Sequence, residues 1–93
     1  MTTATPVQAN EGFRVLEHCM IRSMQLSAPR SADERLLAAR KGAIDAICQH
    51  PALDRNGLRR LERIARGQDS GLVIAYLGGD RAQAAAIFDQ LDA

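Results

Sequence analysis

Apolar residues recur with helical spacing soon after the amino terminus. Phe13, Leu16, Met20 and Met24 follow one another at intervals of three or four residues, and polar side chains occupy most positions between them. This spacing places the apolar residues on one side of an α-helix, so a helix is predicted from Glu11 onward. The segment "SAPRS" that follows contains a proline and is expected to end this helix.

A second helix begins at a capping pattern. Ser31 and Glu34 have the spacing of a capping box, in which each side chain accepts a hydrogen bond from the other residue's backbone N–H. The helix is predicted to run to about His50, because Pro51 disfavours a helical residue before it. Gly42 lies in its interior, where glycine costs about 1 kcal/mol relative to alanine, and this indicates close helix packing. Its buried side is expected to contain Leu36, Leu37, Ala43, Ile44, Ile47 and Cys48.

A third helix is predicted after a short polar connection. Asp54 or Asn56 can cap its start, and Gly67 can end it. The residues expected to face inward are Leu58, Leu61, Ile64 and Ala65.

The last part of the chain predicts two short elements joined by glycines. The run "GLVIAYL", which Asp69 or Ser70 can cap, fits either a buried helix or a strand. We predict a helix, because a single strand would have no partner in an otherwise helical chain. Gly78 and Gly79 end this element, and Asp80 begins another helix. The inward-facing residues of that last helix are predicted to be Ala84, Ile87, Phe88 and Leu91.

These patterns predict an all-α fold, a single small bundle of four to five short helices. The helical domain is expected to span residues 11–93, after a flexible tail of residues 1–10. The sequence shows neither a signal-peptide pattern nor a long apolar run, so a cytoplasmic location without membrane contact is expected. There Cys19 and Cys48 would be reduced, although an oxidised preparation could bridge them. The preference for arginine over lysine, with many alanines, is typical of a GC-rich bacterial genome.

Arginines dominate one face of the third predicted helix. The residues that share this face are Arg55, Arg59, Arg63 and Arg66, with Arg60 beside them. Arginine binds carboxylates and phosphates bidentately, so we interpret the face as a contact for an acidic or helical partner; the alternative is a solvated face that Glu62 partly balances. Arg40 falls among apolar positions of the second helix, at the rim of the core or in a contact with a partner or a second copy.

Nucleic-acid binding is the second hypothesis. Arg55, Asn56 and Arg59 are residue types that read base edges, which makes a DNA-binding regulator using the helix around 55–66 conceivable. Against this, the net charge is only +1, and the connection between the second and third helices is longer than in a helix-turn-helix. Aromatic residues make up 3% of the chain, which disfavours stacking on single strands.

No metal, cofactor or catalytic function is predicted. The soft metal ligands are His18, Cys19, Cys48 and His50, and their spacing is not that of a zinc site. No spacing indicates a nucleophile with an activating base, so the protein is not expected to be an enzyme.

A short segment near the carboxyl end resembles one tetratricopeptide repeat. In "GDRAQAAAIF", Gly79, Asp80, Ala84 and Phe88 occupy positions similar to those of the turn and second helix of such a repeat. The resemblance covers residues 71–91, without a second copy at the 34-residue period. "LERIARGQDSGL" also resembles the closing helices of tetratricopeptide-like chaperones of type III secretion systems, which hold a partner helix in a groove. The resemblance implies a protein–protein interaction module: an adaptor, chaperone-like subunit or inhibitor.

Overall fold

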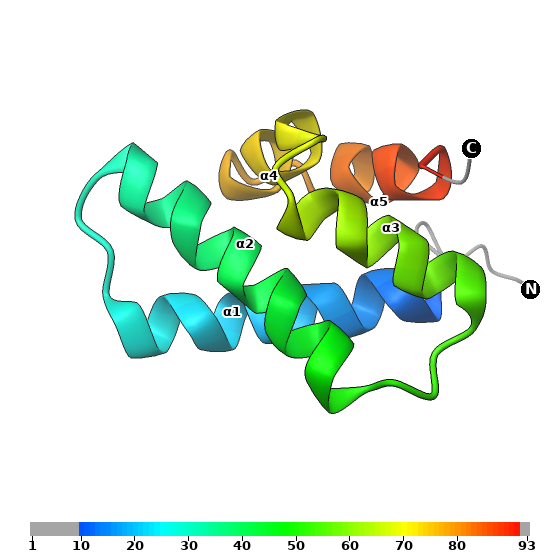
Figure 1. Ribbon diagram of the computed structural model, residues 1–93. Helices are drawn as coiled ribbons and strands as arrows, with labels where there is room; N and C mark the ends of the chain where they lie inside the picture. Colours follow the sequence, from blue (N-terminus) through cyan, green and yellow to red (C-terminus); the bar gives the residue numbers. More distant parts are fainter. Residues whose placement is uncertain (1–9, 92–93) are drawn as a thin grey trace, which may run out of the picture.

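The computed structural model describes residues 10–91, which form five α-helices and no strand (Figure 1). The helices are α1 (Glu11–Ser27), α2 (Ala32–Gln49), α3 (Arg55–Ala65), α4 (Ser70–Leu77) and α5 (Arg81–Asp89). The predicted all-α bundle is confirmed, and the run before Gly78 is a helix rather than a strand. The expected tail, residues 1–10, lies outside the described residues except for Asn10, which caps α1.

Four of the five helices have a side-chain cap at their amino-terminal end. Such a cap accepts a hydrogen bond from one of the first N–H groups, which have no partner within the helix. Asn10 caps α1, Asp54 caps α3 and Asp80 caps α5, each accepting a hydrogen bond from a backbone N–H of the first turn. The capping box of α2 is present: the Glu34 N–H donates to Ser31 Oγ at 3.1 Å, and the Ser31 N–H donates to Glu34 Oε1 at 3.0 Å. The helix starts predicted from Ser31, Asp54 and Asp80 are therefore confirmed, whereas the cap at Asn10 was not predicted.

Helices α1 and α2 cross at very short range. A Cβ atom built on Gly42 would lie 2.7 Å from Cα of Met20 and 2.9 Å from the carbonyl oxygen of Cys19. No side chain fits there, so the predicted close packing at Gly42 is confirmed. The residues that α2 buries are all small: Ala38, Ala39, Gly42, Ala43 and Ala46.

The predicted buried side of α2 was wrong for Leu37, Ile44 and Cys48, whereas Ala43 is buried and Leu36 and Ile47 are half-buried against the core. The side chain of Leu37 is 61% exposed, that of Ile44 is 48% exposed, and Cys48 is exposed as well. The physical reason is the close crossing, since only small side chains let the backbones of α1 and α2 approach. The helix is consequently rotated, so that its alanines face inward and these larger residues face solvent. Cys19 is buried in α1, and both thiols are free.

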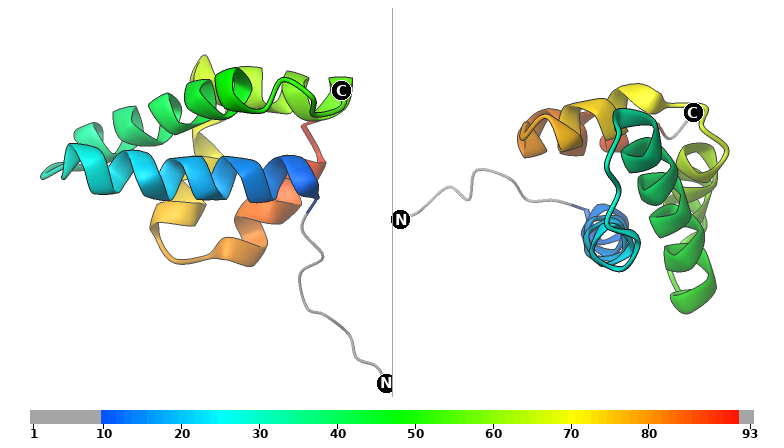
Figure 2. Two further views of the ribbon diagram at one scale, coloured as in Figure 1. Left: turned by 90° about the horizontal axis from the view of Figure 1, so that it is seen from below. Right: turned by 90° about the vertical axis from the view of Figure 1, so that its left-hand side faces the viewer.

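The core joins α1 to the carboxyl-terminal hairpin. The ring of Phe13 packs edge-on against Phe88, with centroids 5.6 Å apart, and against Tyr76 at 6.3 Å. In the left-hand view of Figure 2, α1 lies between the α4–α5 hairpin and the α2–α3 pair, and the right-hand view shows the hairpin lying above both α1 and α2. The largest fully buried side chains are Phe13, Leu16, Met20, Leu61, Ile64, Leu72 and Phe88.

The turn between α4 and α5 is built by two glycines. Gly78 follows the last residue of α4, and Gly79 has a φ of +92°, which a residue with a side chain adopts only at a cost. The N–H of Asp80 donates to the carbonyl of Ala75 at 2.9 Å and closes the end of α4. Ala84 and Phe88 of α5 are fully buried, as their spacing predicted.

No helix within residues 10–91 is long and apolar enough to cross a membrane.

Candidate interaction surface

Helix α3 divides sharply into a buried side and a charged side. Leu61 and Ile64 are buried in the core, whereas Arg55, Arg59 and Arg66 are exposed to solvent. Because the apolar side is anchored, these three guanidinium groups are carried on a firmly held helix. They form what we call the α3 arginine face.

Two arginines predicted to belong with this face are placed differently. Arg60 is only 9% exposed, and its guanidinium carbon lies 5.4 Å from the centroid of the Phe88 ring in a cation–π contact. It is therefore part of the core rather than of the exposed surface. Arg63 is half-buried, and its Nε makes no hydrogen bond within residues 10–91.

Arg40 lies beside the carboxyl-terminal end of α3. A Cβ atom on Gly67 would meet the guanidinium of Arg40, 2.8 Å from Cζ and 3.0 Å from Nε. Gly67 has a φ of +75° and directly follows Arg66, so the fold brings Arg40 next to the last turn of α3. A cation is favourable there, because the unsatisfied carbonyls at a helix end carry partial negative charge. Arg40 is half-buried at the rim of the core, as one of the two interpretations expected; its contact with a partner or a second copy stays a prediction.

Comparison of the chain with protein-family models, with curated proteins and with solved structures finds no match.

A charged network ties the α4–α5 hairpin to α1. Arg81 donates through Nε and Nη2 to the two carboxylate oxygens of Glu17, and the Tyr76 hydroxyl donates to the same carboxylate at 3.0 Å. The Arg81 hydrogen bonds hold the pKa of Glu17 below its ordinary value, although desolvation acts against them. Burial, together with the bond to Glu17, raises the pKa of Tyr76 to about 12. The partners are about sixty residues apart in sequence, and no local pattern could have indicated this network.

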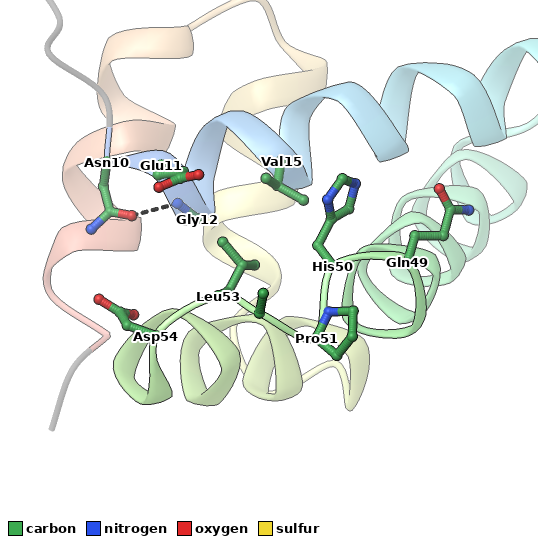
Figure 3. Close-up of a pocket in the computed structure, with 10 residues that line it drawn as sticks. Asn10, Glu11, Gly12, Val15, Gln49, His50, Pro51, Leu53 and Asp54 are labelled. Carbon is green, nitrogen blue, oxygen red and sulfur yellow. Dashed lines mark hydrogen bonds between the residues drawn. The ribbon is translucent and has the colours of Figure 1, made fainter.

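A polar groove of about 520 Å³ opens at the other end of the molecule, between the start of α1 and the α2–α3 connection (Figure 3). The imidazole of His50 points toward Val15 across this groove, with the carboxylates of Glu11 and Asp54 on its rim. The Oδ1 atom of Asn10 accepts a hydrogen bond from the N–H of Gly12 at 2.6 Å. The Oδ1 atom of Asp54 accepts one from the N–H of Gly57 at 2.7 Å. Among the residues that line the groove, Glu11 and Asp54 are the two acidic ones and no lysine or arginine is present, in contrast with the arginine face.

A neighbouring opening of about 620 Å³ shares Glu11 and His50 and brings His18 to the same side of the molecule. Within residues 10–91 no three histidine, cysteine, aspartate or glutamate side chains are placed to hold a metal ion.

A further surface lies on the exposed side of α2, where Leu37 and Ile44 are solvent-exposed. Leu37, Lys41, Ile44 and Cys48 are spaced four, three and four residues apart, so they share one side of the helix. We call this side the α2 stripe. The apolar pattern of α2 was visible in the sequence, but periodicity does not show whether an apolar side faces the core or the solvent. Its alanine-rich opposite side was the signal that could have decided this.

Proposed function

We propose that the protein is a small interaction module that binds an acidic, helical segment of a partner protein. The observation that carries the proposal is the α3 arginine face: Arg55, Arg59 and Arg66 are exposed together on a helix whose opposite side is anchored in the core. Arginine binds carboxylates with two parallel hydrogen bonds, which gives such a surface both affinity and orientation.

The charges around this face support an acidic ligand. Glu62 is the one acidic residue within α3, and Arg40 adds a cation at the end of the helix that carries Arg66. Partner binding of this kind needs no metal or cofactor, and the proposal includes no catalytic step.

The proposal is tested with a fluorescein-labelled amphipathic peptide of about 18 residues, long enough to form a helix on binding, with leucines on one side and glutamates on the other. Fluorescence anisotropy should show saturable binding. The double variant Arg59→Ala/Arg66→Ala should weaken it by about tenfold or more, as expected when charged contacts are removed. The matched control is Arg14→Ala/Arg22→Ala, which removes two exposed arginines from α1 and should leave the affinity within about twofold. Equal affinities for the wild type and the Arg59→Ala/Arg66→Ala variant would refute the proposal.

DNA binding is a second candidate, because Arg55, Asn56 and Arg59 are exposed near the start of α3, where base-reading residues lie in helices that enter a major groove. The net charge of +1 argues against it. A labelled duplex of about 20 base pairs tests it: binding that falls steeply with salt and is lost in the Arg59→Ala/Arg66→Ala variant would favour DNA over an acidic peptide.

A further inference from the structure

Glu62 lies within the line of arginines on α3 rather than on another side of the helix. Arg55, Arg59, Glu62 and Arg66 are spaced four, three and four residues apart, which places them in one line along the helix. All four are exposed. The N–H of Arg66 donates to the carbonyl of Glu62 at 3.0 Å, so helical geometry continues to the end of the line. We call these four residues the α3 row; its charges are, in order, positive, positive, negative and positive.

The carboxylate of Glu62 is not paired with its neighbours in the row. Its spacing to Arg59 and Arg66 would allow ion pairs along the helix. Neither pair is formed in the part of the chain that the structure describes. Exposed pairs of this kind gain little, because two long side chains must be ordered to form them. The charges of the row therefore face solvent and can be contacted by a ligand.

The charges that flank the row leave its order unchanged. Two acidic residues lie beyond its ends: Asp54 caps α3 through the N–H of Gly57, and Asp69 is half-buried before α4. Two further cations lie beside it, the half-buried Arg63 and, at the carboxyl-terminal end of the helix, Arg40. A ligand on the row consequently meets three guanidinium groups, with one carboxylate between the second and the third.

We propose that Glu62 determines which acidic partner the α3 arginine face accepts. The partner helix carries one lysine or arginine that lies against Glu62, and its acidic residues lie against the three arginines. A single opposite charge fixes the register of two paired helices, because a shift by one position along the row would place like charges opposite each other at two positions. This inference rests on the proposed function, and it adds the charge pattern of the partner and the residue that selects it.

The same carboxylate disfavours nucleic acid. Side chains three or four residues apart are neighbours on a helix, so a phosphate bound by Arg59 or Arg66 would lie near Glu62. Every backbone phosphate is negative, and none can pair with a carboxylate. Because a protein helix can place a cation at that position, the row fits a helix of mixed charge better than a duplex.

A second copy of this chain fits the row less well. Two antiparallel α3 helices would pair Arg59 of each copy with Glu62 of the other, but they would also oppose Arg55 and Arg66 at both ends. Two parallel helices would oppose like charges at every position. Like charges placed opposite each other are destabilising, and the row contains no apolar side chain to offset the repulsion.

The test compares two labelled peptides of identical composition. The row spans about 16 Å, so a peptide of about 18 residues covers it as a helix. Both peptides carry three glutamates and one lysine at positions spaced like the row. The matched peptide has the lysine third, opposite Glu62; the mismatched peptide has it first, where it opposes an arginine in either direction of binding. Fluorescence anisotropy should show that the wild type binds the matched peptide about threefold or more tightly than the mismatched one.

The variant Glu62→Arg tests whether Glu62 causes this preference. All four positions of the row are then cations, so the two peptides should bind with affinities within about twofold of each other. Glu62 is exposed, and the fold should be retained, which circular dichroism checks. The matched control is Asp33→Arg, which makes the same change of charge at an exposed residue in the first turn of α2 and should keep the preference.

The outcomes separate this inference from the proposed function. Equal binding of both peptides to the wild type, with affinity still lost in Arg59→Ala/Arg66→Ala, overturns the role of Glu62 and leaves the proposed function standing. A preference that persists in Glu62→Arg also overturns that role. Affinities unchanged in Arg59→Ala/Arg66→Ala overturn both proposals.

Two further measurements address the other ligands. Wild-type binding to a duplex of about 20 base pairs that is as tight as binding to the matched peptide would overturn the inference in favour of nucleic acid. Self-association in sedimentation experiments that Glu62→Arg abolishes would overturn it in favour of a second copy. A monomer that discriminates between the peptides and does not bind the duplex supports it.

Discussion

At the scale of single residues, Gly42 determines how closely α1 and α2 approach. Its missing side chain lets the backbone of α2 approach Met20, and the surrounding alanines continue the contact in both directions. Glycine is unfavourable in the middle of a helix, costing about 1 kcal/mol relative to alanine, so the close contact is made at the expense of helix propensity.

We predict that Gly42→Ala destabilises the protein, although alanine is the better helix former. The new methyl group would lie under 3 Å from backbone atoms of Met20 and Cys19, which cannot move away as a flexible side chain could. Overpacking of this kind costs about 1–3 kcal/mol in free energy of unfolding, measured by urea denaturation.

The control for this prediction is Gly71→Ala. A Cβ atom there meets one side-chain oxygen, Asp69 Oδ1, at the ordinary contact distance of 3.4 Å. The substitution should be neutral or stabilise by up to about 1 kcal/mol. A Gly42→Ala protein as stable as the wild type would show that α1 and α2 do not need their close crossing.

At the scale of helices, the α4–α5 hairpin depends on the ion pair between Glu17 and Arg81 for its attachment to α1, in addition to the aromatic contacts of Phe13. The pKa of Glu17 is lowered in the folded protein because Arg81 stabilises its ionised form. The contribution of this pair to stability is therefore complete above the ordinary glutamate pKa of 4.5 and is lost as the pH falls through the lower folded-state pKa.

We predict that Glu17→Gln lowers the melting temperature at neutral pH, and that the difference from the wild type shrinks as the pH is lowered from about 6 to about 3. Glu34 also has a lowered pKa, but its effect is common to both proteins and cancels in the comparison. Thermal melts followed by circular dichroism measure the melting temperatures of both proteins at each pH. A constant difference across the pH range would contradict the assigned role of the carboxylate charge.

At the scale of the whole molecule, one aromatic residue links the two halves. Phe13 of α1 contacts the rings of Tyr76 and Phe88, and the guanidinium carbon of Arg81 lies 5.7 Å from its centroid. The α1–α2 pair and the α4–α5 hairpin therefore share a single core rather than forming separate units.

We predict that Phe13→Ala abolishes cooperative unfolding near room temperature. Truncating a buried phenylalanine costs about 3–5 kcal/mol, a large part of the total stability of a small domain. The control is Leu26→Ala, whose side chain is 77% exposed and which should change stability by less than about 0.5 kcal/mol. Persistence of a cooperative melt within a few degrees of the wild type in Phe13→Ala would contradict a shared core.

Local chemistry was sufficient to predict the helices. Capping side chains, prolines and glycines act within a few residues of the chain, so Ser31 with Glu34, Asp54, and the Gly78–Gly79 pair marked helix ends that the structure confirms. Most residues predicted to be buried in the other four helices are buried or half-buried for the same reason, since apolar spacing defines a side of a helix.

Tertiary structure decided which side of α2 faces the core, a choice at which the sequence hinted only through its alanines, and which arginines face solvent. The rotation of α2 depends on how closely α1 can approach Gly42, and the burial of Arg60 depends on Phe88 of α5 lying beside it. Both contacts join helices that are distant in sequence. Periodicity specifies the faces of a helix, whereas the packing of the whole bundle determines which face is buried and which remains exposed.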